Sequence, residues 1–201
     1  MKTAFLLKIP EKYVNLEIAN NYRQKTKKIK ENLFKVNVRD TPKSIIKLLQ
    51  KPINFEIRME ELKNVKHLIE TYEDLFYILK DFIDARITNE NKKGKSPFWE
   101  YYNPKWDNQC GIRNRTLSEY LKELGFEVRL IGGLYILLDK KKIGGTHVWV
   151  DVKVDNKWIE LDASNSPLYP TCNLVRMNVL KEWDKFDRDY WLKGIIEVDI
   201  W

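Results

Sequence analysis

Apolar residues recur at steps of three and four between residues 59 and 83, which is the spacing of one face of an α-helix. This pattern predicts one long helix, or two helices with a break. A shorter helix is predicted after Thr41-Pro42, because threonine is a favourable N-cap and proline is tolerated at the first helical position. A further amphipathic helix is predicted within residues 18–33. We therefore expect residues 1–95 to form a mainly helical region that packs on the rest of the chain.

A polar, lysine-rich stretch at residues 89–96 is the expected boundary between two regions of the chain. The region that follows, residues 96–201, opens with an aromatic-dense, proline-punctuated loop at 97–107. Beyond this loop, the spacing of the apolar residues alternates between that of helices and that of strands. At the end of the chain we predict a helix at about 177–192 and a short strand at 195–200. The second region is therefore expected to be of the α+β class.

Cys110 precedes a stripe of apolar residues at helical spacing, which ends at Gly125, a residue suited to a helix C-cap. Residues 126–138 predict one strand or two, with Gly132-Gly133 at a bulge or bend. Gly144-Gly145 is predicted to lie in the next loop, either as an ordinary hairpin-end turn or as a movable segment.

Residues 146–154 and 157–163 alternate between apolar and polar positions and predict a β-hairpin around Asp155-Asn156. If these two residues form the turn, Val154 pairs with Lys157, and the numbers of paired residues sum to 311. One face of the hairpin then carries apolar side chains, and this face fixes the register.

The same register places two chemically active side chains on the other face. His147 and Asp162 become diagonal neighbours, about 7–8 Å apart at the backbone, which is within reach of a carboxylate–imidazole hydrogen bond. Asp151 shares this face but lies about 13 Å from His147 along the strand, at ~3.3 Å per residue. Glu160 pairs with Asp151 and is equally remote, so Asp162 is the better partner for the histidine.

Composition makes a substantial core feasible, since 43% of the residues are hydrophobic and 12% aromatic. The net charge of +7 comes mainly from lysines spread along the chain, which most simply form a solvated exterior. The densest basic stretch is residues 22–35, with Glu31 as its one acid. This stretch is a candidate face for nucleic acid or an acidic partner, although it has little aromatic interleaving.

Two cysteines, Cys110 and Cys172, do not make a disulfide framework, so a reduced, cytoplasmic setting is expected. The apolar run at the N-terminus is too short for a signal peptide, and no segment has the length of a membrane span, so no membrane association is expected. With two histidines, no Cys-x-x-Cys and no calcium-type cluster of carboxylates, we expect neither a metal site nor a cofactor.

A cysteine at the start of a helix has the first requirement of a thiol nucleophile, because the helix N-terminus stabilises a thiolate. A histidine can take the proton, and an acid can orient the histidine. Cys110, His147 and Asp162 occur in this order, each at the start or end of a different element. They are the candidate catalytic residues, although ordinary sheet positions for the last two are the alternative.

The motifs around these residues resemble the transglutaminase-like superfamily of papain-type cysteine enzymes. The resemblance rests on Gln109-Cys110-Gly111 at a helix start, His147-Val148-Trp149-Val150 in a strand, and Leu161-Asp162-Ala163-Ser164 after Trp158. It covers about 60 residues, and nothing in residues 1–95 contributes to it. Gly111-Ile112-Arg113 departs from the aromatic or acidic residues that commonly follow the cysteine.

The resemblance implies a papain-like core in which the Cys110 helix packs on an antiparallel sheet bearing His147 and Asp162. It implies acyl transfer from a protein or peptide substrate, with a thioester resolved by water or an amine. The oxyanion would be held by the Cys110 backbone N–H and a side-chain donor, for which the candidates are Trp99, Trp106 and Asn108. A catalytically silent domain that binds a protein or nucleic acid is the alternative function.

Overall fold

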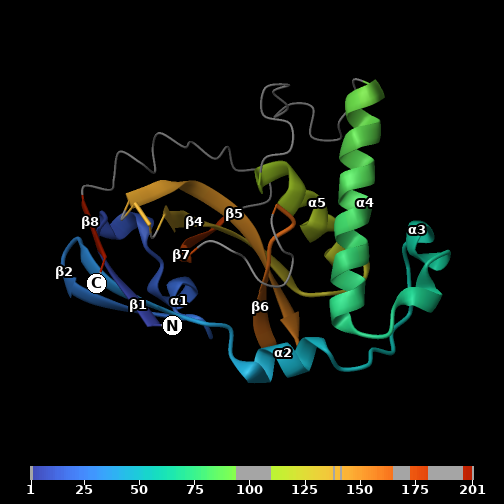
Figure 1. Ribbon diagram of the computed structural model, residues 1–201, viewed down its shortest axis with the longest axis horizontal. Coiled ribbons are helices and arrows are strands. Elements are labelled where there is room, and N and C mark those ends of the chain that lie inside the picture. The colour runs from blue at the N-terminus through green and yellow to red at the C-terminus, as the bar shows by residue number, and fades with distance from the viewer. Residues whose placement is uncertain are drawn as a thin grey trace. The chain divides into compact units, whose positions relative to one another are not determined.

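The computed structural model describes residues 2–93, 110–137, 139–140, 142–164, 173–180 and 197–200 (Figure 1). The chain divides into two compact units. Unit 1 comprises residues 1–42, 130–148 and 170–201, and unit 2 comprises residues 43–129 and 149–169. Both units are therefore built from separated stretches of sequence. The predicted boundary near residue 95 lies outside the described residues and stays a prediction.

Unit 1 contains an antiparallel sheet with strand order β2-β3-β1-β8. Its strands are β1 (Lys2–Lys8), β2 (Gln24–Lys30), β3 (Leu33–Arg39) and β8 (Glu197–Ile200). The helix predicted within residues 18–33 is wrong: after the short helix α1 (Leu16–Ala19) the chain enters the β2–β3 hairpin. The physical reason is the period-two burial of Phe34, Val36 and Val38, which the near-helical spacing upstream of them obscured.

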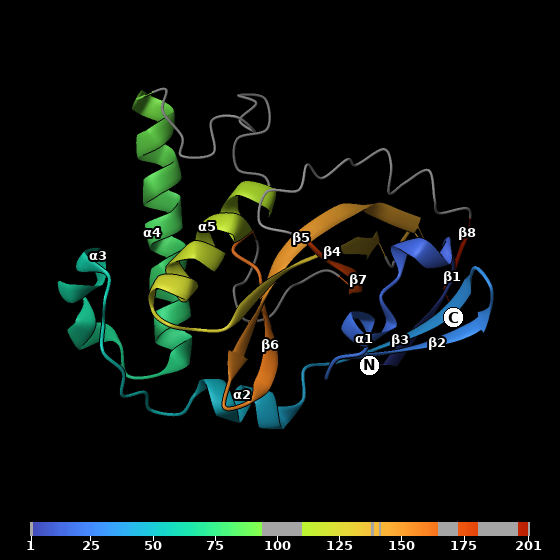
Figure 2. The ribbon, with the colours of Figure 1, turned by 180° about the vertical axis from the view of Figure 1, so that it is seen from behind.

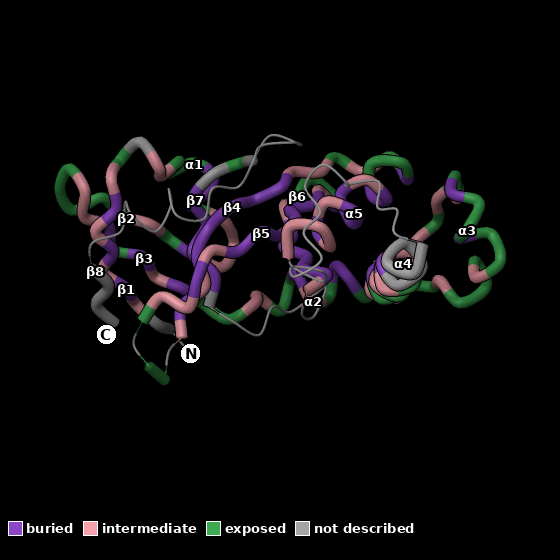
Figure 3. Tube along the Cα trace, turned by 90° about the horizontal axis from the view of Figure 1, so that it is seen from above, coloured by how far each residue is buried: buried purple, intermediate pink, exposed green. Residues whose placement is uncertain are grey.

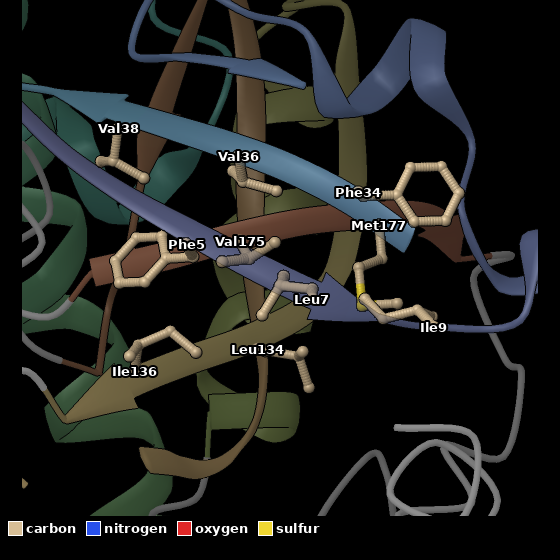
Figure 4. Close-up of a cluster of buried hydrophobic side chains, with 10 residues drawn as sticks. All are labelled: Phe5, Leu7, Ile9, Phe34, Val36, Val38, Leu134, Ile136, Val175 and Met177. Atoms are coloured by element: carbon tan, nitrogen blue, oxygen red, sulfur yellow. The ribbon is translucent and has the colours of Figure 1, made fainter. Parts of the chain in front are cut away.

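Those inward side chains form a hydrophobic cluster with side chains of β4 and β7 in the same unit (Figure 4). Strand β7 (Asn173–Leu180) contributes Val175 and Met177 to the cluster. The helix predicted from about residue 177 is therefore wrong at its start, because pairing of β7 with β4 buries this segment as a strand. The rest of that predicted helix lies outside the described residues.

In the described part of residues 1–42 the one α-helix is the four-residue α1, and the other α-helices of the N-terminal half lie in unit 2. These helices are α2 (Lys43–Leu49), α3 (Glu60–Lys63) and α4 (Tyr72–Lys93). The predicted break occurs before α4, where Thr71 and Asp74 form a capping box: the Asp74 carboxylate accepts the Thr71 N–H at 2.9 Å, and the Thr71 hydroxyl accepts the Asp74 N–H at 3.2 Å. No helix within the described ranges is long and apolar enough to cross a membrane.

A second sheet has the strand order β6-β5-β4-β7. Its remaining strands are β4 (Val128–Leu137), β5 (Lys142–Val154) and β6 (Lys157–Leu161). The predicted irregularity at Gly132-Gly133 is confirmed, since the β4–β7 register shifts between these two residues. Most of β5 from Gly145 onward is buried (Figure 3). The mixture of helices and antiparallel sheet confirms the predicted α+β class.

The β5–β6 hairpin has the predicted register: Val154 pairs with Lys157, and Val150 pairs with Leu161. Asp155 and Asn156 have φ angles of 47° and 59°, as a two-residue turn matching the twist of the strands requires. Because the side chains alternate between faces, this register determines which side chains of the hairpin lie on the same face.

Candidate active site

Cys110 is the first residue of helix α5 (Cys110–Glu123), and its thiol is free and its side chain half-buried. Helix α5 lies beside α4 in two opposite views (Figures 1 and 2). The helix ends at Glu123, and Gly125, which has a φ of 91°, forms the predicted C-cap. The Gly125 N–H donates to the Lys122 carbonyl and the Phe126 N–H to the Leu121 carbonyl, both at 2.9 Å, which is a Schellman cap.

Asn114 lies one turn along α5 from Cys110 and is fully buried, at 0% exposure. Its Nδ2 atom is 3.0 Å from Asp162 Oδ1, 3.1 Å from the Cys110 carbonyl oxygen and 3.2 Å from Ser164 Oγ. Its Oδ1 atom accepts the Ala163 N–H at 2.9 Å. Since an amide nitrogen has two hydrogens, these three acceptors share two donors. Asn114 therefore joins the first turn of α5 to the segment that follows β6.

Asp162 directly follows β6 and is also fully buried, at 0% exposure. Besides Asn114, its Oδ1 atom accepts the Ser164 N–H at 2.9 Å. A buried carboxylate requires such donors, because burial without them is strongly unfavourable. The two donors on one oxygen fix the direction in which this carboxylate points.

Arg113 adds a second connection to the same segment. Its NH1 atom is 3.3 Å from the Ala163 carbonyl oxygen and forms an ion pair with Asp84 of α4, which Lys80 also contacts at 3.2 Å. Burial raises the pKa of Asp84, but the hydrogen bonds from Arg113 and Lys80 outweigh it and hold the pKa below its ordinary value. Helix α4 thus helps to hold the turn that contains Asp162.

Replacing Asp84 by asparagine is expected to lower the melting temperature at pH 7, because Arg113 loses its charged partner. A carboxylate whose folded-state pKa is lowered stabilises the fold above its unfolded pKa of about 3.9, and this contribution disappears as the pH falls through the folded pKa. The difference between wild type and variant should therefore narrow below about pH 4. Thermal unfolding between pH 3 and 7 measures this, and a difference that stays constant over the range would contradict it.

His147 lies in β5 and is 7% exposed. The Tyr135 ring stands 6.2 Å from it, at an interplanar angle of 77°. Gly144 and Gly145 belong to β5, so the loop predicted there is wrong. A Cβ on Gly144 would lie 2.0 Å from the Tyr135 ring, and one on Gly145 would lie 2.9 Å away. The two glycines leave room for this ring, which packs beside the histidine.

The competing acid Asp151 has different surroundings. It pairs with Glu160 in the hairpin register, and its Oδ2 atom lies 3.4 Å from Arg129 NH2. The Arg129 guanidinium in turn lies 3.6 Å from the centre of the Trp158 ring. These contacts place Asp151 in an ion pair with Arg129, and the choice of Asp162 as the partner of the histidine stays a prediction.

The structure thus joins two of the three candidates, Cys110 and Asp162, through Asn114 within unit 2, and places His147 beside Tyr135 in unit 1. The oxyanion candidates Trp99, Trp106 and Asn108 lie outside the described residues, as does Cys172.

Sequence reasoning missed Asn114, Arg113 and Tyr135. A signal for Asn114 was its spacing of four residues from Cys110, which puts both on one side of a helix. A signal for Tyr135 was the glycine pair, since glycine inside a strand marks the close approach of another group.

Comparisons with known proteins identify the class. The sequence model of the Transglutaminase-like superfamily matches residues 58–163, a range that includes helix α5 and the β5–β6 hairpin. The chain belongs to this superfamily. A solved structure from Cytophaga hutchinsonii, described as a candidate cysteine protease, is similar at 11% identity and a TM-score of 0.38, over 100% of this chain and 80% of that one. No curated protein matches the sequence.

Proposed function

We propose that this protein is a cysteine-dependent hydrolase or acyltransferase that acts on peptide or isopeptide amide bonds. Cys110 is the nucleophile, His147 the general base and acid, and Asp162 the residue that orients His147. The observation that carries the proposal is the buried Asn114, hydrogen-bonded to Asp162 and to the carbonyl of Cys110. In a thiol active site an acid orients the base that activates the cysteine, and Asn114 holds such an acid against the first turn of the helix that carries the cysteine.

The hairpin register supports the role of His147. The last pair in β6 is Val150 with Leu161, and extension of this register by one residue would put Asp162 opposite Trp149. His147 lies two residues further along β5 and therefore has the same facing as Trp149. On this register Asp162, whose Oδ1 is held by the Asn114 amide and the Ser164 N–H, is the acid that we propose for orienting His147.

The reaction proceeds in two steps. His147 takes the proton of the Cys110 thiol, and the sulfur attacks the amide carbonyl to form a tetrahedral oxyanion. This intermediate collapses to a thioester as the C–N bond breaks, and His147 returns the proton to the leaving amine. Water or a second amine then attacks the thioester, His147 again moves the proton, and the thiol is released.

The oxyanion is held in this scheme by the Cys110 N–H and a side-chain donor, one of Trp99, Trp106 and Asn108. Hydrolysis is the outcome proposed first, because the sequence carries no calcium-type carboxylate cluster such as would accompany a calcium-dependent transferase. The proposed setting is cytoplasmic, and the proposed partner is a protein or peptide substrate.

The test needs no substrate. Site-resolved iodoacetamide alkylation, followed by mass spectrometry at pH 6, should label Cys110 faster than Cys172, and His147→Ala should slow only the Cys110 reaction. Faster alkylation of Cys110 that depends on His147 is expected if the thiol transfers its proton to His147 and forms a thiolate. Equal Cys110 rates in wild type and His147→Ala would reject the triad and favour the catalytically silent domain.

A further inference from the structure

The first sheet of unit 1 has one apolar face and one basic face. On β3 the inward side chains are Phe34, Val36 and Val38, so the residues between them point outward. The basic face is defined here by five outward, solvent-exposed side chains of β2 and β3: Lys25, Lys27, Lys30, Lys35 and Arg39. The basic stretch found in the sequence is therefore the surface of a sheet rather than of a helix.

None of these five side chains has an ion-pair or hydrogen-bond partner in the part of the chain that the structure describes. Lys28 provides the contrast: it pairs with inward Phe34, so it faces the other way, and its Nζ atom binds Glu11 at 2.6 Å. The two acidic residues of β8, Glu197 and Asp199, pair with β1 at the opposite edge of the sheet.

Two features separate this face from an ordinary lysine-protected edge. Lysines commonly guard an edge strand against pairing with other chains, and β2 is an edge strand. Lys35 and Arg39, however, lie on β3, which is flanked by β2 and β1. Lys27 and Lys35 are also directly opposite each other in the register, and like charges in that position destabilise a sheet.

We propose that the basic face is a binding surface for an acidic polypeptide segment in an extended conformation. An anionic partner would relieve the repulsion between Lys27 and Lys35, for which no described side chain of the sheet supplies a counter-charge. Lys25 and Lys27 are two residues apart on one strand, about 6.6–6.8 Å. An extended peptide with a carboxylate at every second residue repeats at the same spacing, so its charges match those of β2.

A polypeptide fits this face better than single-stranded nucleic acid does. Surfaces that bind single strands usually stack the bases on aromatic side chains. The outward positions of β1, β2 and β3 carry no aromatic residue; besides the basic side chains they hold Ala4, Leu6, Leu33 and Asn37, and exposed Ile29 lies at the irregularity in β2.

The test is fluorescence anisotropy with the full-length chain carrying Cys110→Ser, so that turnover does not interfere and binding is measured independently of the proposed activity. The probe is a fluorescein-labelled 12-residue peptide of alternating Glu and Ala. We expect saturable binding at 50 mM salt that weakens as salt is added. The triple variant Lys25→Gln, Lys27→Gln, Lys35→Gln should bind about tenfold or more weakly, since three exposed ion pairs are lost.

The matched control removes the same charge elsewhere, through exposed lysines of unit 2: Lys47→Gln, Lys66→Gln, Lys157→Gln. It should bind within about twofold of the parent protein. Lys28→Gln against Lys27→Gln compares adjacent residues on opposite faces, and only the second should weaken binding. No saturable binding, equal losses in both triple variants, or tighter binding of a 12-nucleotide oligothymidine would each overturn the proposal, the last in favour of nucleic acid.

Discussion

Replacing Cys110 by serine is expected to reduce amide turnover by about 10⁴-fold or more, because removal of the nucleophile leaves only binding and oxyanion stabilisation. Asp162→Asn should cause a comparable loss, since an amide in place of the carboxylate no longer holds the histidine in its productive tautomer. Release of dye from labelled casein measures hydrolysis, and incorporation of dansylcadaverine into casein measures transfer.

Two controls make this prediction specific. Cys172→Ser tests whether any cysteine substitution has the effect, and Asp151→Asn tests the neighbouring acid that pairs with Arg129. Both should retain activity in proportion to the folded protein measured by circular dichroism. Activity that survives Cys110→Ser would reject the catalytic proposal, and activity lost with Asp151→Asn but kept with Asp162→Asn would reverse the assignment of the acid.

The parts of the structure that the sequence predicted correctly are those governed by local rules. The hairpin register followed from one turn, because Asp and Asn tolerate the left-handed backbone found at Asp155 and Asn156. The C-cap of α5 at Gly125 followed from the same preference in glycine. These features depend on residues close in sequence, so no knowledge of the fold was needed.

The failures involve contacts between distant residues. Strands β1 and β3 pair across more than twenty residues and become strands because their apolar sides share a core with β4 and β7. The near-helical spacing of apolar residues within 18–33 did not predict these strands, because burial in the tertiary structure overrides a weak periodicity in the sequence. The role of Asn114 was hidden for a similar reason: its partner Asp162 is separated from it by 48 positions.

Asn114 nevertheless determines how the acid of the proposed triad is held. Its Nδ2 atom donates to Asp162, and its Oδ1 atom accepts the Ala163 N–H. Alanine would remove both, so the Ala163 N–H would lose this acceptor and Asp162 Oδ1 would lose one of its two donors, at about 1–3 kcal/mol for each buried hydrogen bond lost. Aspartate is the sharper substitution, because it keeps the acceptor and the shape and replaces only the donor.

Asn114→Asp is expected to make activity depend on pH in a way that wild type does not. The new carboxylate would lie about as close to Asp162 Oδ1 as Asn114 Nδ2 does, at 3.0 Å, and two carboxylates so close cannot both ionise without strong repulsion. At acidic pH one shared proton replaces the lost N–H and preserves the geometry. At higher pH the proton leaves, Asp162 is displaced, and kcat should fall by about 10²-fold relative to wild type.

The measurement is the ratio of variant to wild-type kcat between pH 5 and 8, with melting temperatures recorded at each pH. A positioning role predicts a ratio near one at pH 5 that declines with pH in kcat rather than in KM, ahead of any loss of folded protein. A ratio that is flat across this range in a folded variant would show that the hydrogen bond to Asp162 does not matter for turnover. A ratio that only follows the folded fraction would assign Asn114 to stability alone, because every loss of activity would then be a loss of native protein.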